Sequence, residues 1–517
     1  MRRQRAWAAL QWAVLWHCWL LLLGTGAEGQ IVNQTTIFKA LLRQEEPTPP
    51  GKVEVLTYAP GFERARTDAD LAQLFRDNLD PDLAPFKRSG GISIQEFKEF
   101  VTTFNEAVPK HELGEGNAGL VVVRNGSVQV HWLRGGDNHW RFACIKAAVE
   151  SARSLRFPDS AFIVNIDDFP ICKEGRCPLP VFTNYKKWRG GKNLDTNEVL
   201  FPVFNHHYED LYVFPWERKR PKAFMRASQQ GCMPANSSRA VLAVTSEYHP
   251  QQLDLGITRI DGSDKHFLKF RFSKAGFVSI EDHAKWKYLL SADGCVAQTR
   301  LVKVMLANSV VLKEESDWIE YYYRSLKPWK HYAPFRAGPD AGEQVIGLVQ
   351  HLEAHESKAR AIASEAQHWA YRYLSQYPRL LYFRRQLLEY NKLFKGGMEA
   401  WVAAGGPEEL VGHELAAAKR RAHTRLAAAH LHLRRIARKS AMRLQHADQG
   451  GAAALASSSS SSSGSSSSEE QQGLLQRQQH FWLGHGLQAN SSGISSWGIS
   501  GSTCLSQAAA CGGGSRE

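Results

Sequence analysis

The chain has 517 residues, of which 43% are hydrophobic and 22% charged, so two to four domains with sizeable cores are expected. Its formal net charge is +13, but the basic excess lies at the ends. Residues 415–447 carry nine Lys or Arg and no acid, and residues 2–5 carry three more Arg. The main body is therefore nearly neutral, which argues against a body-wide surface for nucleic acid.

The N-terminus has the pattern of a targeting segment. A basic cluster at 2–5 precedes an apolar run over 6–23 and small residues at 24–27. This predicts a cleaved signal peptide or an uncleaved signal anchor over 1–27, the anchor being the only expected membrane contact. We therefore expect the secretory-pathway lumen, in the Golgi or ER, or secretion.

Cysteines and glycosylation sequons fit that compartment. Cys172 and Cys177 bracket a short turn and could close a small loop, while the pairing of the other cysteines stays open. Four N-x-[ST] sequons begin at Asn33, Asn125, Asn236 and Asn490. Such triplets indicate surface exposure in a secreted protein.

The first part of the chain is mostly helical in pattern, over 30–110. Ser93 and Glu96 form a capping-box signature that opens apolar spacing as far as Phe104. Apolar runs at 120–123 and 128–132 then flank Asn125-Gly126, which predicts a β-hairpin.

Beyond the hairpin, short apolar strands alternate with helices. We expect strands near 161–166, 200–204, 223–225 and 309–312 and helices near 139–155 and 299–307. This alternation predicts an α/β fold with parallel pairing, and 115–340 has room for two sheets. Residues 342–395 are again helical, 413–447 form a basic amphipathic helix, and the Ser-rich end from 451 is a disordered tail by composition.

Asp168 follows the predicted strand 161–166, and Pro170 ends that strand. Open α/β sheets bind ligands beyond the carboxyl ends of their strands, so a carboxylate here is placed to take a proton from an acceptor hydroxyl. Asp167 would add negative potential beside it. Alternatively, both are ordinary turn acids.

A second candidate is the loop 293–300, which contains Gly294 and runs into a helix at Arg300. Helix N-termini attract phosphate, and Arg adds a bidentate donor. Arg226, at the end of the predicted strand 223–225, could clamp a diphosphate. The alternatives are a plain loop capped by Thr299 and two solvated arginines.

Two further basic clusters stand nearby. His283, Lys285 and Lys287 precede an apolar run, and residues 327–332 around Trp329 are dense in aromatic and cationic residues. The second cluster could be a rigid core loop or a wall that stacks on uridine.

Four blocks in this order, 163–170, 223–228, 283–300 and 317–332, resemble one family. They are similar to the V-I-N-x-R-D-Y-P, A-Y-F-R-G-S and H-x-K-Y-K-Y-L motifs, and to the aromatic block that follows, of the Rumi-like, capsule-associated glycosyltransferases (glycosyltransferase family 90). That family includes protein O-glucosyl- and O-xylosyltransferases. The resemblance covers roughly 115–395.

The resemblance implies a GT-B architecture of two Rossmann-like lobes, with helical additions at both ends. It implies an inverting transferase without essential metal or other cofactor, using a UDP-sugar donor and a glycoprotein or glycan acceptor. Glucose or xylose would be transferred to a hydroxyl, with Asp168 as catalytic base. The implied donor-binding residues are Arg226, Ser228, Gly294, Ala297, Gln298, Thr299 and Arg300. Further donor or acceptor contacts would come from Asp167, His283, Lys285, Lys287 and Trp329.

The chain departs from the family pattern at several positions. Asp167 replaces a cation beside the base, Ala227 replaces a Gly, Gln229 replaces a second Arg, and 298–299 are Gln-Thr. These departures motivate an alternative, a catalytically silent module that binds carbohydrate or protein. The basic helix 413–447 could add an accessory contact to nucleic acid or a membrane surface.

These patterns predict seven segments. They are 1–27, signal peptide or anchor; 28–110, helical N-terminal region; 111–205, acceptor-side lobe; 206–370, donor lobe; 371–395, a helix packing back on the lobes; 396–450, basic helical extension; and 451–517, Ser-rich tail.

Overall fold

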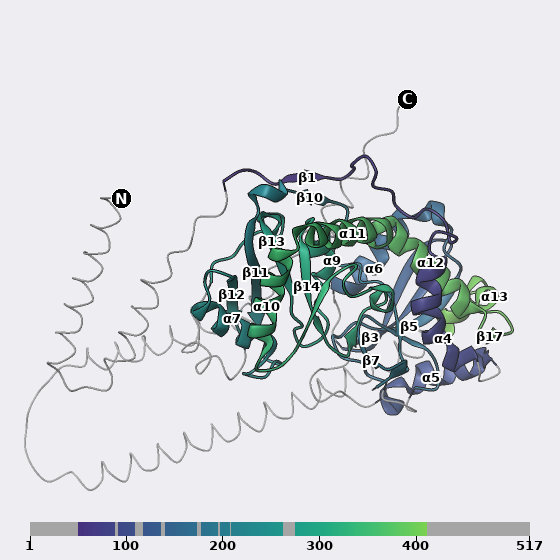
Figure 1. Cartoon of the computed structure of the whole chain (residues 1–517). Coiled ribbons are helices and arrows are strands. Elements are labelled where there is room, and N and C mark those ends of the chain that lie inside the picture. The colour runs from purple at the N-terminus through teal and green to yellow at the C-terminus, as the bar shows by residue number, and fades with distance from the viewer. Residues whose placement is uncertain are drawn as a thin grey trace, which may run out of the picture.

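A computed structural model of the chain describes residues 50–87, 91–108, 117–135, 140–172, 177–194, 197–206, 208–261 and 275–410 (Figure 1). The predicted signal segment, the basic helix 413–447 and the Ser-rich tail lie outside the described residues. Within them, no helix combines the length and the apolar character needed to cross a membrane.

The first sheet has five strands in the order β4-β3-β5-β6-β9. Their bounds are β3 Ala118–Arg124, β4 Ser127–Arg134, β5 Ser160–Asn165, β6 Val181–Thr183 and β9 Val199–Leu200. β3 pairs antiparallel with β4 and β5, whereas β5, β6 and β9 are parallel. The predicted hairpin is confirmed, since Asn125 and Gly126 both have positive φ, 49° and 73°, as the tight turn requires. The predicted strand 200–204 is shorter, because Pro202 has no N–H to donate.

Helices cover the first sheet. Phe142 of α6 (Trp140–Ser151) packs edge-on against Trp132 of β4. Tyr390 of α12 (Gln376–Asn391) contacts Phe162 of β5 and Phe182 of β6. α12 therefore packs on the first sheet.

The N-terminal region is mainly helical, with two short strands. Its elements are β1 Glu54–Leu56, α3 Ala72–Leu74, the π-helix η1 Phe75–Leu79, α4 Asp80–Lys87, β2 Ile92–Ser93 and α5 Ile94–Ala107. The predicted capping box opens α5: Ser93 Oγ accepts from the Glu96 amide at 3.1 Å, and Glu96 Oε2 accepts from the Ser93 amide at 2.6 Å. The buried triad of Asp82 with Lys186 and Arg324, each at 2.7 Å, joins this region to the rest.

The second sheet is parallel throughout, in the order β12-β11-β13-β14-β16. Its strands are β11 Arg220–Gln229, β12 Leu253–Ile260, β13 Trp286–Ser291, β14 Val310–Glu315 and β16 Ala333–Arg336. Its helices are α7 Ser238–Tyr248, α9 Leu301–Met305, α10 Ala341–Ala354 and α11 Glu356–Leu374. The strand order reverses between β11 and β13. In open sheets of this kind, ligands bind at that reversal, outside the carboxyl ends of the strands.

Side chains of β11 alternate between two apolar cores. Ala223, Met225 and Ala227 enter a core against α7 and α10, whereas Phe224 joins the larger core that continues into the first sheet. The Arg226 guanidinium lies 4.5 Å above the Phe224 ring, so both point to the same face. Arg226 therefore projects from the face nearer the first sheet.

The two sheets lie side by side, the second at the left of Figure 1 and the first at the right. β15 (Trp318–Ile319) follows β14 and pairs with β7 (Lys186–Arg189), which also pairs with β8 (Lys192–Asn193). The remaining short elements are β10 Leu211–Val213, β17 Phe394–Lys395, α13 Met398–Ala403 and the 3₁₀ turns Arg153–Leu155, Trp216–Arg218, Glu281–Lys285 and Tyr323–Ser325.

Candidate active site

Asp168 lies just beyond the carboxyl end of β5, with its side chain 34% exposed. Arg141 of α6 donates from Nη2 to Asp168 Oδ1 at 2.7 Å and from Nη1 to the carbonyl of Ile166. Burial lowers the pKa of Arg141, but attraction by Asp168 and Tyr185 outweighs it and leaves that pKa raised. A permanent cation thus holds the candidate base.

Asp167 has a different role from the one expected. Its two carboxylate oxygens accept from the amide of Asn117, at 2.8 Å, and from Asn117 Nδ2, at 2.7 Å. The residue ties the start of β3 to the end of β5. The cation that the family pattern places at 167 is here supplied beside Asp168 by Arg141, a residue that sequence reasoning missed.

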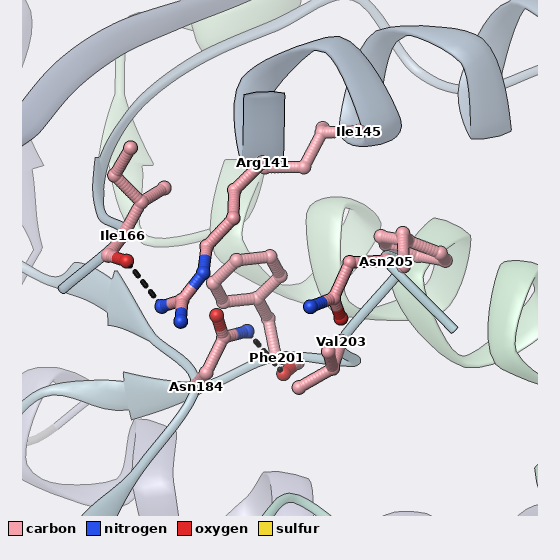
Figure 2. Close-up of a pocket in the computed structure, with 8 residues that line it drawn as sticks. Arg141, Ile145, Ile166, Asn184, Phe201, Val203 and Asn205 are labelled. Atoms are coloured by element: carbon pink, nitrogen blue, oxygen red, sulfur yellow. Dashed lines mark hydrogen bonds between the residues drawn. The ribbon is translucent and has the colours of Figure 1, made fainter. Parts of the chain in front are cut away.

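A small cavity adjoins Arg141 at this edge (Figure 2). Its lining comprises Arg141, Ile145, Ile166, Asn184, Phe201, Val203, Phe204 and Asn205. Asn184 Nδ2 donates to the Phe201 carbonyl at 3.4 Å, and buried Asn205 Oδ1 has no hydrogen-bond partner among the described residues. Asn184 directly follows β6, so its position beyond a parallel strand is a signal that could have found it.

Arg226 lies on β11 and is fixed by the neighbouring strand. Its Nη2 contacts Asp254 Oδ1 at 2.7 Å and its Nη1 donates to the Asp254 carbonyl at 2.9 Å. The side chain is 11% exposed. Arg226 is therefore an ion-paired residue of the sheet edge, and its partner Asp254 was not anticipated.

Arg300 lies next to Arg226. Its Nη1 donates to the Arg226 carbonyl at 2.9 Å, and burial lowers its pKa. The predicted helix 299–307 is only five residues long as α9, so the phosphate attraction of a long helix end is absent. Side chains, more than helix amides, supply the positive charge here.

We call residues 293–299 the donor loop, because the family resemblance predicts that they bind the sugar donor. Asp293 Oδ1 accepts from the Gln298 amide at 3.1 Å, and the Gly294 amide donates to the Val296 carbonyl at 3.0 Å. A Cβ on Gly294 would lie 2.5 Å from Gln230 Oε1, so a larger residue there would displace the Gln230 side chain.

The remaining predicted members of the loop contribute in different ways. Ala297 is buried in the core, and buried Gln298 Oε1 has no hydrogen-bond partner among the described residues. The Thr299 carbonyl accepts from the Tyr208 hydroxyl at 2.9 Å, which links the loop to the segment that follows β9. Ser228 offers its carbonyl to another arginine, Arg239.

Arg239 of α7 bridges two strand ends and was also missed. Nη1 donates to the Ser228 carbonyl at 2.8 Å, while Nε and Nη2 donate to the Ala292 carbonyl at 3.1 Å. Burial lowers the pKa of Arg239 to about 10. The carboxyl ends of β11 and β13 are thereby held together at the strand-order reversal.

Two buried acids stand beside the donor loop. Glu314 Oε2 accepts from the Asp293 amide at 2.9 Å, and Ser316 Oγ donates to Asp293 Oδ2. Burial raises the pKa of Asp293. Burial, and then repulsion by Asp293, raises the pKa of Glu314 to about 7.

His283 is the one member of the first basic cluster that reaches the site. It is 5% exposed, and its ring lies 4.9 Å from that of Phe224. Burial, followed by repulsion from Arg300 and Arg226, lowers its pKa to about 4, so it is neutral at pH 7.

Lys285, Lys287 and Trp329 do not join this site. Lys285 pairs with Asp282 at 2.7 Å, and Lys287 lies 3.8 Å from Glu356. Trp329, at φ 61°, lies under Lys358 at 4.5 Å. Their described partners are thus Asp282, Glu356 and Lys358, whereas His283 lies against Phe224, beside Arg226.

The two carboxyl edges lie within electrostatic reach of each other. The pKa of His206 is lowered to about 3 by burial and then by Lys303, Arg379, Arg141 and Arg300. Arg141 belongs to the first-sheet edge and Arg300 to the second-sheet edge, so both edges act on one imidazole. Among the described residues, no group of three or more His, Cys, Asp or Glu is arranged to hold a metal ion.

An α/β molecule with a doubly wound parallel sheet and cations at its switch point belongs to a class that commonly binds nucleotides. Residues 141–404, about half of the chain, match glycosyl transferase family 90. The chain belongs to this family.

Relatives of known name agree with that assignment. Mouse protein O-glucosyltransferase 3 is 30% identical over 275 residues, covering 48% of this chain and 51% of that protein. The O-glucosyltransferase rumi homolog of Aedes aegypti is 26% identical over 341 residues, covering 62% and 78%. The chain thus matches about half the length of the mouse relative. The crystal structure of Anabaena Alr3699/HepE in complex with UDP-glucose is 15% identical, with a TM-score of 0.23, over 32% of this chain and 47% of that one, a likeness too distant to carry an argument.

Proposed function

We propose that the chain is an inverting glycosyltransferase that moves glucose or xylose from a UDP-sugar to a hydroxyl of a glycoprotein or glycan. The observation that carries this proposal is that Asp168 lies beyond β5 of one sheet and Arg226 and Arg300 lie together at the other, while Arg141 and Arg300 both act on His206 between these groups. The two sheets would correspond to the acceptor and donor lobes of a GT-B enzyme. The relatives' names favour glucose as the sugar.

In the proposed reaction, Asp168 accepts the proton of the acceptor hydroxyl while the oxygen attacks the anomeric carbon and the bond to UDP breaks. Its partial exposure leaves room for an acceptor, and Arg141 holds one oxygen so that the other is available. Attack opposite the leaving group inverts the anomeric centre. The anomeric carbon thus forms a bond to the acceptor oxygen and loses its bond to the UDP oxygen.

The departing diphosphate gains negative charge, which Arg226 and Arg300 would stabilise. Arg226 is already paired with Asp254, so a bound diphosphate would share or displace that carboxylate. Arg300 lies beside it, and burial lowers its pKa, so a bound anion would favour its charged form. We propose that these side chains do the work that a metal does in other transferases.

We also propose a secretory-lumen location. The two described sequons, Asn125 and Asn236, are exposed, as a glycan would require. The pairs Cys172–Cys177 and Cys232–Cys295 are disulfide-bonded, which confirms the predicted small loop and fits an oxidising compartment.

The test is turnover of UDP-glucose and UDP-xylose in EDTA by wild type and Asp168→Asn. Loss of a general base typically costs about 10²–10⁴-fold, so we expect about a 10³-fold fall in kcat. Asp261→Asn, a surface acid paired with Arg259, is the matched control and should keep wild-type turnover.

Three outcomes would contradict parts of the proposal. A folded wild type that turns over neither donor would remove the enzymatic function, and retained UDP or glycan binding would then favour the silent binding module. Activity lost in EDTA and restored by manganese would show that the reaction needs a metal. Retention of the anomeric configuration would contradict inversion.

A further inference from the structure

The Cys232–Cys295 disulfide joins the two loops that flank the strand-order reversal. Cys232 lies three residues after the end of β11, and Cys295 lies four residues after the end of β13 within the donor loop. Their Cα atoms are 5.6 Å apart. The bond therefore spans the point where the sheet would receive the donor's diphosphate.

A second contact joins the same two loops. Gln230 Oε1 accepts from the Cys295 amide at 3.4 Å, and a side chain at position 294 would displace it from that contact. On the Cys232 side, the Met233 amide donates to the Gln230 carbonyl at 3.0 Å, which closes a tight turn. The donor loop is thus held by Gln230 of this turn as well as by the carboxylates of Asp293 and Glu314.

The disulfide lies close to the charges of the site. Four residues separate Cys295 from Arg300, whose guanidinium is bonded to the Arg226 carbonyl. Arg239, bonded to the carbonyls of Ser228 and Ala292, holds the strands from which both loops leave. Release of Cys295 would free the loop amides while leaving the sheet edge below them intact.

We propose that the Cys232–Cys295 disulfide positions the donor loop, so that tight binding of a nucleoside diphosphate depends on the intact bond. This inference rests on the proposed function, since it assigns the diphosphate to that loop. Fixing a binding loop in its bound conformation raises affinity by removing the cost of ordering it. Both cysteines are positioning residues and take no part in the transfer.

The disulfides Cys232–Cys295 and Cys172–Cys177 differ in solvent exposure, so a reducing agent should reach them at different rates. Cys232 is exposed and Cys295 is partly exposed, whereas Cys172 and Cys177 are buried, at 2% and 8%. Thiol exchange requires access of the attacking thiolate to sulfur. A dithiol such as dithiothreitol would pass two electrons and two protons to Cys232–Cys295 first, giving two thiols and the cyclic disulfide of the reagent.

The experiment measures UDP binding by calorimetry to wild type, to Cys232→Ser/Cys295→Ser and to the matched control Cys172→Ser/Cys177→Ser. We expect Kd for UDP to rise about tenfold in the first double variant, which corresponds to about 1.4 kcal/mol. The control should stay within about twofold of wild type. In steady-state kinetics, KM for the UDP-sugar should rise by a larger factor than kcat falls in the Cys232→Ser/Cys295→Ser variant.

A second measurement tests the proposal on wild-type protein, in case the Cys232→Ser/Cys295→Ser variant does not fold. Folded wild type is treated with limiting dithiothreitol, the freed thiols are mapped by alkylation and mass spectrometry, and UDP binding is measured before and after reoxidation. Reversible loss of affinity together with labelling of Cys232 and Cys295 supports the proposal. An unchanged Kd after opening of this bond overturns it while leaving the proposed function intact. Absence of UDP binding by oxidised wild type overturns both.

Discussion

The carboxyl edges of the two sheets hold their charged groups in different ways. At the first edge, the side chains of Asp168 and Arg141 are 34% and 21% exposed and form one ion pair. At the second edge, Arg239 and Glu314 are only 5% and 6% exposed and bond to backbone groups of the strands. One edge is solvated and the other is built into the core.

This difference follows from what each edge would do. A general base must release its proton to solvent after each turnover, so a partly exposed carboxylate suits it. A site for a diphosphate needs fixed positive charge in surroundings of low dielectric, where electrostatic interactions are strong. Buried charges carry a desolvation cost, so changes to Arg239 and Glu314 at the second edge should act mainly on folding, and changes to Asp168 and Arg141 at the first edge on turnover.

The largest effect is expected for Arg239→Met. It removes the donors to the Ser228 and Ala292 carbonyls and leaves both buried, so the free energy of unfolding should fall by about 2–4 kcal/mol. Denaturant unfolding measures this. Arg259→Met, at a side chain 49% exposed on β12, is the control and should stay within about 0.5 kcal/mol. An unfolding free energy equal to that of wild type would show that the second edge does not depend on its buried cation.

A smaller effect is expected for Arg141 variants at the first edge. Arg141→Gln leaves Asp168 without its cation, so kcat should fall about 10–100-fold while KM for the donor changes little. Arg141→Lys should recover part of kcat, because an ammonium keeps the charge but cannot bond both Asp168 and the Ile166 carbonyl in the same way. Steady-state kinetics with both variants is the measurement.

The comparison of the edges fails if Arg141→Gln destabilises the protein as much as Arg239→Met does. We expect its free energy of unfolding to change by less than about 1 kcal/mol, since the ion pair is partly exposed. A wild-type kcat in a folded Arg141→Gln variant would contradict the positioning role.

Local signals in the sequence predicted local structure well. The Asn125-Gly126 turn and the Ser93–Glu96 capping box are confirmed, because each depends on residues at most three apart. The lengths of strands were harder to predict. β11 extends over ten residues where three were predicted. Its polar ends at Arg220 and Gln229 have no apolar pattern to signal a strand and are extended because they pair with the neighbouring strands.

The partners of the site residues could not be predicted, because they are distant in the sequence. Asp167 bonds Asn117, 50 residues away, and Arg226 bonds Asp254, 28 residues away. The role of Asp168 as catalytic base stays a prediction. Lys287 and Trp329 contact Glu356 and Lys358 of α11, partners that clustering in the sequence does not reveal.

The smallest effect is expected in the pH dependence of stability at the second edge. The pKa of Glu314 is raised to about 7, chiefly by burial, above an unfolded value of about 4.3. The folded state therefore holds a proton that the unfolded state has lost at intermediate pH. Stability from this group is complete below about pH 4.3 and is lost as the pH rises toward 7.

Glu314→Gln mimics the protonated carboxyl and should remove that loss. The difference in Tm between variant and wild type should grow by about 2–4 °C between pH 4.5 and 7.5, in favour of the variant. His206 and His283, with pKa values of about 3 and 4, destabilise the fold as the pH falls below 6.5, but they act equally in both proteins and cancel in the difference. Glu343→Gln, in the exposed first turn of α10, is the matched control and should show a constant difference. A constant difference for Glu314→Gln as well would mean that the acid is ionised in the fold at low pH, and the second edge would then be solvated like the first.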